Sequence, residues 1–469
     1  MLININIFIF IVFLLINTIS SLNETLLFVF QMSRNGARAP NSGVNNGKDI
    51  YFEKWISNGE LSNVGKRQQY LLGVKARKKY IEKYNLLSES YNPQEIYIKS
   101  TDNNRTIESI YSFIQGLYSN GTGQKINENV VSNTNITYPP NKNFDTKFEY
   151  ILQNFLINND TSSLPYNMTI LPIHIFYDPD HHFQLYDIKN CPGIKNISEK
   201  QKNREEIKEF SNRLKNGSKD FFKELEKKFT NESKVEDNFL ENYTTLYRYM
   251  DSFVCDEKDQ RDFSYLNIFT DYSLNLENLH NISTDFIKDD YKANINSKNI
   301  SIVDTSYTLR SILNWMDKAI EKYNNSINIS NGFNDTQNYI KYVIFSSQGS
   351  SIGTLDSFMH YFFNISIDDI DFSESRYFEL YIVNETEQIN VRYLKGDNKI
   401  KMNTNYKIFK NIVEKNIWNN TKIYEFCFPT ENKKTKYDIN MVGASIMIIL
   451  SVLDGVLFVL LILYCYKKS

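Results

Sequence analysis

The stretch Leu26–Pro40, LLFVFQMSRNGARAP, indicates the fold class of this chain. It begins with an unbroken apolar run, which is typical of a strand buried on both faces of a parallel sheet. The run passes into a polar loop, Ser33–Pro40, that carries two arginines. In open α/β sheets ligands bind beyond the carboxyl ends of the strands, so this loop is a candidate binding element.

The same succession occurs twice more along the chain. Glu95–Lys99 (EIYIK) precedes the polar loop Thr101–Arg105, and Tyr342–Phe345 (YVIF) precedes the Ser-rich loop Ser346–Ser351. Each loop leads into a segment with apolar residues at helical spacing. Three units of strand, loop and amphipathic helix predict an α/β fold, with a mostly parallel sheet flanked by helices.

The helices of these units have predicted inward faces. Ser62 is expected to cap a helix over about residues 63–84, and the other two helices follow the second and third loops. The residues expected to point inward are Val64, Tyr70, Leu71 and Val74 in the first helix, Ile107, Ile110, Tyr111, Ile114 and Leu117 in the second, and Ile352, Leu355, Met359 and Phe362 in the third.

The three loops suggest an anion site. Two of them carry arginines, and the third places a Ser-rich turn at the start of a helix. Guanidinium groups and helix N-terminal amides together bind anions, most simply phosphate. The alternative is that the three loops are unrelated and their arginines are solvated.

The middle of the chain differs from both flanks. Residues 199–229 are highly charged and helical in pattern, and a further helical segment covers 237–251. We therefore expect a mainly helical insertion, residues 185–299, within a discontinuous α/β domain of residues 22–184 and 300–430. A helix over Tyr307–Tyr323 then leads back to the third strand.

Composition excludes several classes of protein. The chain has 469 residues, 53 Lys and Arg against 55 Asp and Glu, and a formal net charge of −2. That balance gives no overall attraction to nucleic acid. Four cysteines are too few for a disulfide-dense scaffold. The length predicts two or three domains.

Both ends of the chain are apolar. Residues 7–16 have the length of a signal-peptide core, and small residues near Ser20 predict a cleaved signal over residues 1–21, although the segment lacks Lys and Arg. An uncleaved anchor is the alternative. Met441–Cys465 is long enough for one transmembrane helix, with a juxtamembrane linker over 431–440 and a tail over 466–469.

These ends predict a single-pass type I membrane protein whose body is extracellular or luminal, in a secretory or lysosome-like location. Asp454 lies in the middle of the span, where it is either a contact to a partner helix or a tolerated acid. Asn-x-Ser/Thr sequons are frequent, for example at Asn135, Asn196 and Asn364, and predict a glycoprotein.

Five blocks in order resemble the histidine acid phosphatases, in branch 2 of the histidine phosphatase superfamily. The loop Arg34–Pro40 (RNGARAP) is similar to the family's Arg-His-Gly-x-Arg-x-Pro signature. The other four blocks are Gly59–Gln68, Lys99–Thr106, Pro172–His174 followed by Cys191-Pro192, and Val343–Ser351. The resemblance covers roughly Leu26–Pro429, and the terminal segments resemble the anchored lysosomal and prostatic types.

The resemblance implies a site with three arginines and two chemical groups. In the family a His attacks phosphorus and an Asp protonates the leaving oxygen, while three Arg and a second His bind the phosphoryl oxygens. Here Arg34, Arg38 and Arg105 match the phosphate-binding arginines. Positions that match the nucleophile, the binding His and the acid hold Asn35, Gln348 and Gly349.

These replacements predict that no catalytic residue remains. The amide of Asn35 cannot form a phosphorus–nitrogen intermediate as imidazole does, and Gly349 has no proton to give. The leading hypothesis is a pseudophosphatase that binds phosphate or a phosphomonoester without turnover and needs no cofactor or metal. The alternatives are an active phosphomonoesterase that uses another nucleophile, such as Ser33 or Asp102, and a surface protein for recognition or adhesion.

The resemblance also bears on the cysteines. It implies a disulfide between Cys191 and Cys427. Cys255 matches a cysteine of the family's cap, the domain inserted above the sheet, and its usual partner position holds Ser375. Cys255 is therefore either free or paired between two chains, which would give a homodimer.

Overall fold

The computed structural model describes the α/β body and parts of the insertion. It describes residues 24–41, 57–131, 161–175, 191–202, 205, 208–212, 223, 226, 242–259, 281–288, 297–328, 339–396 and 398–428. The predicted signal peptide and the predicted span Met441–Cys465 lie outside these residues. Among the helices that are described, none is both long enough and apolar enough to cross a bilayer.

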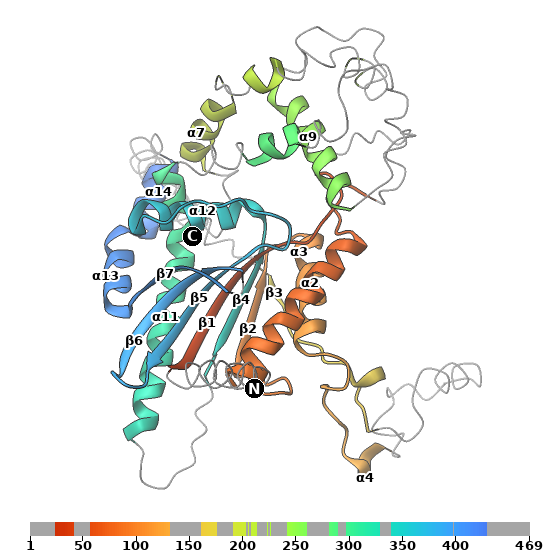
Figure 1. Cartoon of the computed structure of the whole chain (residues 1–469), viewed down its shortest axis with the longest axis vertical. Coiled ribbons are helices and arrows are strands. Elements are labelled where there is room, and N and C mark those ends of the chain that lie inside the picture. Colours follow the sequence, from red (N-terminus) through yellow and green to blue (C-terminus); the bar gives the residue numbers. More distant parts are fainter. Residues whose placement is uncertain are drawn as a thin grey trace, which may run out of the picture.

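One seven-stranded sheet forms the centre of the body, in the order β3-β2-β4-β1-β5-β6-β7 (Figure 1). All three strands expected from the sequence are present, as β1, β2 and β4. The strands are β1 Glu24–Arg34, β2 Ile96–Ser100, β3 His174–Ile175, β4 Tyr342–Ser347, β5 Ser375–Val383, β6 Gln388–Lys395 and β7 Lys399–Asn405.

The sheet is mixed, so the prediction that it is mostly parallel is not confirmed. Strands β3, β2, β4 and β1 pair in parallel, whereas β1 pairs antiparallel with β5, and β5–β6 and β6–β7 are also antiparallel. Strands β5, β6 and β7 follow one another through short turns, and such turns can join only antiparallel neighbours. The sequence analysis had not identified these three strands.

Helices cover both faces of the sheet (Figure 1). Helices α2 and α3 and the segment η1 pack on one face, and α11, α12 and α13 pack on the other. The helical elements are α2 Asn63–Ala76, η1 Arg77–Lys83, α3 Asn104–Leu117, α4 Glu128–Val131, η2 Pro165–Asn167, α7 Pro192–Lys202, α9 Tyr243–Lys258, α11 Lys298–Asn328, α12 Gly349–Phe363, α13 Tyr406–Asn416 and α14 Asn420–Cys427.

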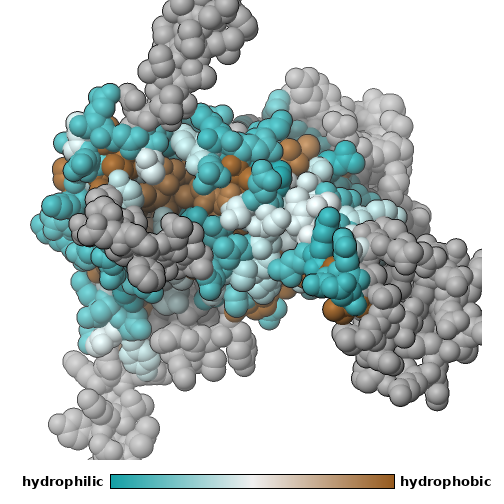
Figure 2. Space-filling model, turned by 90° about the horizontal axis from the view of Figure 1, so that it is seen from below, coloured by the Kyte–Doolittle hydropathy of each residue, from teal (hydrophilic) through white to brown (hydrophobic). Residues whose placement is uncertain are grey.

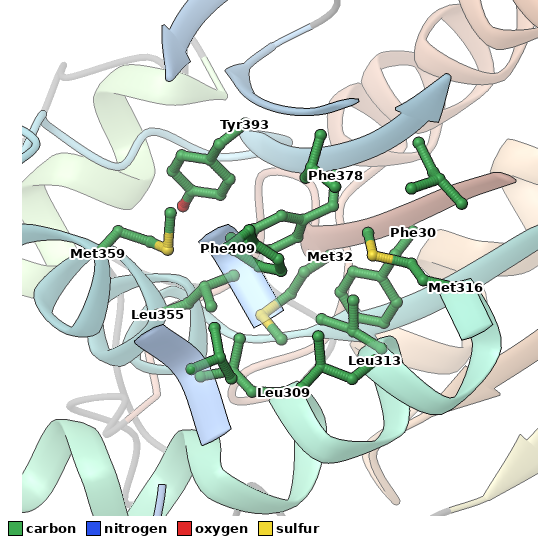
Figure 3. Packing of buried hydrophobic residues seen from close by; sticks show 14 of the residues in the cluster. Phe30, Met32, Leu309, Leu313, Met316, Leu355, Met359, Phe378, Tyr393 and Phe409 are labelled. Atoms are coloured by element: carbon green, nitrogen blue, oxygen red, sulfur yellow. The ribbon is translucent and has the colours of Figure 1, made fainter. Parts of the chain in front are cut away.

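Successive side chains of a strand point to opposite faces of the sheet, and they form one apolar layer on each face. On β1, Phe30 and Met32 face α11 and α12, whereas Val29 joins the layer beneath α2 and α3. Figure 3 shows Phe30 and Met32 among leucines of α11 and α12, with Phe409 of α13 closing the layer. Seen from below, hydrophobic groups gather in a band bordered by hydrophilic surface (Figure 2).

The predicted inward face of the first helix is wrong. Ser62 does cap α2, accepting from the Gly65 amide at 3.0 Å, but Val64, Tyr70 and Leu71 are 38%, 38% and 51% exposed. The buried side of α2 instead consists of Gly65, Gln69, Gly73 and Ala76. In α3, Tyr111 is 47% exposed, whereas Ile110, Ile114 and Leu117 are buried as expected.

Close approach of α2 and α3 explains this choice of small residues. A Cβ on Gly73 would lie 2.0 Å from the Phe113 carbonyl oxygen, and a Cβ on Gly116 would lie 2.1 Å from the Tyr70 carbonyl oxygen. Larger side chains therefore cannot occupy the seam between the two helices. They point away from it, which a count of apolar residues at helical spacing cannot distinguish.

The described residues of the insertion are helical and lie beyond the carboxyl ends of the parallel strands (Figure 1). They include α7, α9 and a helix over 281–288. Helix α11 begins at Lys298 and ends at Asn328, so it is longer at both ends than the predicted Tyr307–Tyr323. The expected disulfide Cys191–Cys427 is present and connects the residue before α7 to the end of α14.

Candidate functional site

Strand register brings the three predicted loops together. In the parallel pairs, Arg34 is level with Ser347, and Ser100 is level with Ser346. The Asn35 amide donates to the Ser347 carbonyl at 3.0 Å, which continues the pairing beyond the end of β1. The loops after β1, β2 and β4 therefore leave the sheet side by side, as the sequence predicted.

Arg34 and Arg38 lie against one aromatic ring. The guanidinium carbon of Arg34 is 4.1 Å from the centre of the Phe372 ring, and that of Arg38 is 5.6 Å from the same centre. Arg34 also donates through Nη1 to the Ile370 carbonyl at 2.6 Å. Both arginines are buried, so the segment around Phe372 covers the first loop.

A carboxylate of the insertion pairs with Arg38. Nη2 and Nη1 of Arg38 donate to the two carboxylate oxygens of Asp251 at 2.9 and 3.1 Å, a bidentate arrangement. The Asn41 amide donates to the same carboxylate at 2.8 Å. Arg38 and Asp251 are only 4% and 5% exposed. Asp251 on α9 thus accepts from both terminal nitrogens of Arg38.

The charge state of this pair follows from its surroundings. Burial is the largest single influence and lowers the pKa of Arg38, but the charge and hydrogen bonds of Asp251, together with Cys255 and Tyr247, outweigh it, so the net pKa is raised. Cys255 lies one helical turn from Asp251, and its Sγ is 3.5 Å from Nη1 of Arg38. Burial, followed by the negative charge of Asp251, raises the pKa of the Cys255 thiol and keeps it neutral.

Cys255 is a free, fully buried thiol in this structure. It packs against Arg38 and Asp251 rather than facing solvent, so a bond to a second chain would require the insertion to move. The geometry therefore favours the free-thiol alternative over the interchain disulfide. Ser375, the position of the family's partner cysteine, is instead hydrogen-bonded to Ser33 at 2.8 Å.

Arg105 stands at the start of α3, beside the same loops. Its Nη1 donates to Oδ1 of Asn103 at 3.0 Å. A Cβ placed on Gly59 would lie 3.2 Å from this Nη1 and 3.5 Å from Oδ1 of Asn41. Because the Asn41 amide also contacts Asp251, Arg105 borders the region around the Arg38–Asp251 pair, and glycine at 59 leaves space for its guanidinium.

The three positions that match catalytic residues are also at this edge of the sheet. Asn35 is 2% exposed, and its side-chain Nδ2 donates to the Gly36 carbonyl at 2.8 Å. Gln348 is the N-cap of α12, and Gly349 is the first residue of that helix. The backbone amide of Asn35 donates to the carbonyl of Ser347, the residue directly before Gln348. All three positions are therefore neighbours.

The alternative nucleophiles are poorly placed. Ser33 is 3% exposed and is held between the Ser375 hydroxyl and the side-chain amide of Gln31, which donates to it at 2.6 Å. Asp102 is exposed at the loop surface. Ser33 is thus enclosed by other side chains, and Asp102 is open to solvent.

The two histidines that the structure describes contact residues outside the three loops. His174 stacks on Tyr97 with ring centres 4.6 Å apart, and Nδ1 of His360 is 2.9 Å from the Ile365 carbonyl oxygen. His181, His182 and His280 lie outside the described residues. Among the side chains that the structure describes, no group of three His, Cys, Asp or Glu residues is arranged to hold a metal ion.

A small cavity lies beside Arg34. Arg34, Asp251 and Phe372 line a cavity of about 40 Å³, which is closer to the room needed by one or two waters than to that needed by an organic phosphate. Two ion pairs join the insertion to the body at its rim, Lys258–Asp371 at 3.6 Å and Lys288–Asp369 at 2.9 Å. Among the described residues, these two ion pairs hold the insertion against the segment around Phe372.

A family model, "Histidine phosphatase superfamily (branch 2)", matches residues 25–355, which is more than half of the chain. The chain belongs to this superfamily. The matched range includes Arg34, Arg38 and Arg105 as well as α9 and the start of α12. The family that the sequence blocks resembled is thereby confirmed.

Curated relatives match over limited segments. Lysophosphatidic acid phosphatase type 6 of Mus musculus is 37% identical over 81 residues, which are 17% of this chain and 19% of the relative. Lysosomal acid phosphatase of Xenopus laevis is 36% identical over 120 residues, 25% of each. The matched part thus spans about a fifth to a quarter of these relatives.

Solved structures match over most of the fold. A phytase of Hafnia alvei in complex with myo-inositol hexakis sulphate has a TM-score of 0.53 and 14% identity, covering 84% of this chain and 98% of the phytase. The phytase of Citrobacter braakii has a TM-score of 0.52 and 11% identity, with the same coverage. At these identities the likeness shows the shared fold of the superfamily alone.

Two residues of the site were missed by the sequence analysis. Asp251 and Phe372 carry no motif, and they lie far along the chain from the arginines that they contact. A signal for Asp251 was present, because it precedes Cys255 by four residues and so shares its face of a helix. Phe372 had no comparable signal.

Proposed function

We propose that this member of the superfamily is a pseudophosphatase that retains a phosphate-binding site without turnover. The proposal is supported by the neighbouring positions of Asn35, Gln348 and Gly349, where the family places its nucleophile, its binding His and its acid. Loss of a nucleophile alone typically lowers turnover by about 10⁴–10⁶-fold. Family membership itself is established; inactivity and anion binding are proposed.

The observation that carries the proposal is the charge arrangement around Arg38. A buried guanidinium that donates to both oxygens of a carboxylate has the geometry that also fits two oxygens of a phosphate. We infer that a phosphate or phosphomonoester binds in competition with Asp251. Binding then requires α9 to withdraw Asp251, and the ion pairs at the rim open with it.

The test is to measure ligand binding and turnover together, on the purified full-length chain in detergent. Phosphate or vanadate is expected to raise the Tm, while an aryl phosphate at about pH 5 is not hydrolysed. Turnover would support the active-enzyme alternative. Absence of any response to these anions would support a scaffold for recognition or adhesion, and would overturn the proposed anion site.

Asp251→Asn separates the competition from general charge effects. Removing the carboxylate's charge frees Arg38 for an external anion, so the phosphate-induced rise in Tm is expected to exceed that of the wild type. Glu89→Gln is the matched control, since Glu89 is exposed, lies outside this cavity and removes the same charge. Equal phosphate responses in the two variants would contradict the role given to Asp251.

Restoring the family's residues tests the proposed alignment. The triple variant Asn35→His, Gln348→His and Gly349→Asp should acquire turnover of an aryl phosphate. A folded triple variant without activity would argue against the assignment of these three positions. Its Tm with and without phosphate reports whether the arginines still bind an anion.

We further propose that the protein is a type I membrane glycoprotein. The support is the apolar stretch Met441–Cys465, the apolar amino-terminal segment and the sequons. We expect the chain to resist extraction of membranes at alkaline pH and to increase in mobility after removal of N-glycans. Release of the protein by alkaline extraction would contradict the membrane anchor, and unchanged electrophoretic mobility would contradict glycosylation.

A further inference from the structure

A second basic cavity lies on the body, away from the loops at the carboxyl ends of the strands. It has a volume of about 330 Å³ and opens between η1 and the strands β5 and β6. The cations that line it are Lys75, Lys78, Lys79, Lys83 and Arg392. None of them contributes to the Arg34–Arg38 site, so this cavity is a separate feature of the molecule.

The backbone explains how four lysines gather here. After α2 the chain continues as the π-helix η1, in which the Tyr84 amide donates to the Lys79 carbonyl, five residues back, at 3.0 Å. A π-helix has a wider turn than an α-helix, and Lys78 and Lys83, five residues apart, both line the cavity. Lys75 and Lys79, four apart across the junction, share a face.

Only part of this positive charge is compensated. Glu379 is fully buried at the cavity floor and accepts from Lys79 at 2.9 Å, Arg392 at 2.7 Å and the Tyr80 hydroxyl at 2.7 Å. Arg392 also donates to Glu24 at 2.9 and 3.0 Å. Two carboxylates thus offset Lys79 and Arg392, and they fix these cations in place.

Three cations remain at the walls. Lys75, Lys78 and Lys83 are exposed side chains of the cavity, and among the residues that the structure describes they form no ion pair. Lys83 places its ammonium 5.2 Å from the Tyr84 ring, beside the cavity. Like charges that line one cavity repel one another, so the cavity favours an occupant that brings several negative charges.

We propose that this cavity binds a compact, multiply charged phosphate-bearing anion. Its volume lies within the range of small-molecule sites and exceeds the needs of a single inorganic ion. Lys75, Lys78 and Lys83 provide the charge, while Arg392 and Lys79 form a floor fixed by Glu379. The source of the phosphate groups is either a free oligophosphate or a lipid headgroup, which share this chemistry.

The test is calorimetric titration of the full-length protein in detergent with inorganic tripolyphosphate. Replacing Lys75, Lys78 and Lys83 by Gln is expected to weaken binding at least about tenfold, a loss of about 1.4 kcal/mol. The control variant replaces the exposed Lys407, Lys415 and Lys422 by Gln and removes the same charge outside the cavity. Equal weakening in both variants, or no binding by the wild type, would overturn the proposal.

A second variant distinguishes this cavity from the phosphatase-like site. Arg38→Met combined with Asp251→Leu removes the buried ion pair as a unit, and tripolyphosphate binding should persist. Loss of binding in this variant but not in the lysine variant would place the anion in the other site and contradict the proposal. Flotation with vesicles that carry a bisphosphorylated headgroup then identifies the source of the phosphate groups. If the wild type floats with the vesicles and the lysine variant does not, the ligand is a lipid headgroup. If the wild type binds tripolyphosphate but does not float, the ligand is a free anion.

Discussion

Arg38 and Asp251 are 213 positions apart in the chain, yet they form the buried ion pair around which the site is built. Arg38 was assigned to phosphate binding from its motif, and the structure places it at the expected end of β1. The contact of Asp251 with Arg38 could not be predicted, because the spacing from Cys255 indicates a shared helix face and not the distant cation that the acid meets. Sequence patterns locate residues along an element, but pairing between elements depends on the three-dimensional packing.

The buried pair predicts an asymmetry between single and double variants. Asp251→Asn leaves an uncompensated guanidinium, so it should lower the free energy of unfolding by about 3–5 kcal/mol in phosphate-free buffer. The double variant Arg38→Met with Asp251→Leu should lower the free energy of unfolding much less, since both charges are removed together. Denaturant titration measures both, and equal losses in the two variants would contradict the expected coupling.

Asp304 predicts a pH dependence of stability. Burial raises the pKa of this carboxyl from 3.8 to about 8. Between these values the unfolded chain binds fewer protons than the folded chain, so the contribution of Asp304 to stability falls as pH rises from about 4 to about 8. The folded chain is thus favoured by mildly acidic conditions at this position.

The variant Asp304→Asn should lose this contribution. Its amide is neutral throughout, so the decrease in Tm between about pH 5 and about pH 8 should be smaller than in the wild type. Glu414→Gln, at an exposed position, is the control and should keep the wild-type profile. An unchanged profile in Asp304→Asn would show that the carboxyl does not retain its proton in the fold.

At the scale of elements, the prediction succeeded where a strand is buried on both faces and failed where an element's face is set by close packing. The apolar runs of β1 and β4 identified these strands directly. Strands β5 and β6 were missed because buried charged residues such as Glu379 and Arg392 interrupt their apolar pattern. The inner face of α2 was missed because glycine, the residue that faces α3, carries no hydropathy signal.

Close packing of α2 against α3 predicts that Gly73→Ala, a substitution that normally favours a helix, destabilises this protein. In an exposed helix, Gly→Ala stabilises by about 1 kcal/mol. In Gly73→Ala the new Cβ would lie 2.0 Å from the backbone oxygen of Phe113, so the helices must separate. We expect a loss of about 1–3 kcal/mol. Leu71→Ala, at an exposed position of the same helix, should change the free energy of unfolding much less. Stabilisation by Gly73→Ala would contradict the packing described.

At the scale of the whole molecule, one covalent link joins the start of the insertion to the end of the body. Cys191 and Cys427 are 236 residues apart in sequence. Replacing both by Ser should lower the free energy of unfolding by about 2–5 kcal/mol, because the unfolded chain loses a large closed loop. Reductant should lower the Tm of the wild type towards that of this variant and leave the variant unchanged. Equal Tm values without reductant would contradict a stabilising disulfide.

Packing between the insertion and the body limits what the sequence can predict about the site. The order of the motifs along the chain was sufficient to identify the superfamily and to place three loops at one edge of the sheet. The covering of Arg34 and Arg38 was not predictable, since it arises where α9 and the segment around Phe372 meet these arginines. That contact depends on how a helical insertion docks on the body, for which no local pattern exists.

Turnover of an aryl phosphate by the purified full-length chain, from about pH 4 to about pH 8, tests the central claim most directly. The account predicts a rate no greater than that of a protein-free blank, whereas the variant with Asn35→His, Gln348→His and Gly349→Asp gains activity. Saturable turnover by the wild type that is lost in Arg34→Met would contradict it, because the site would then contain a working nucleophile.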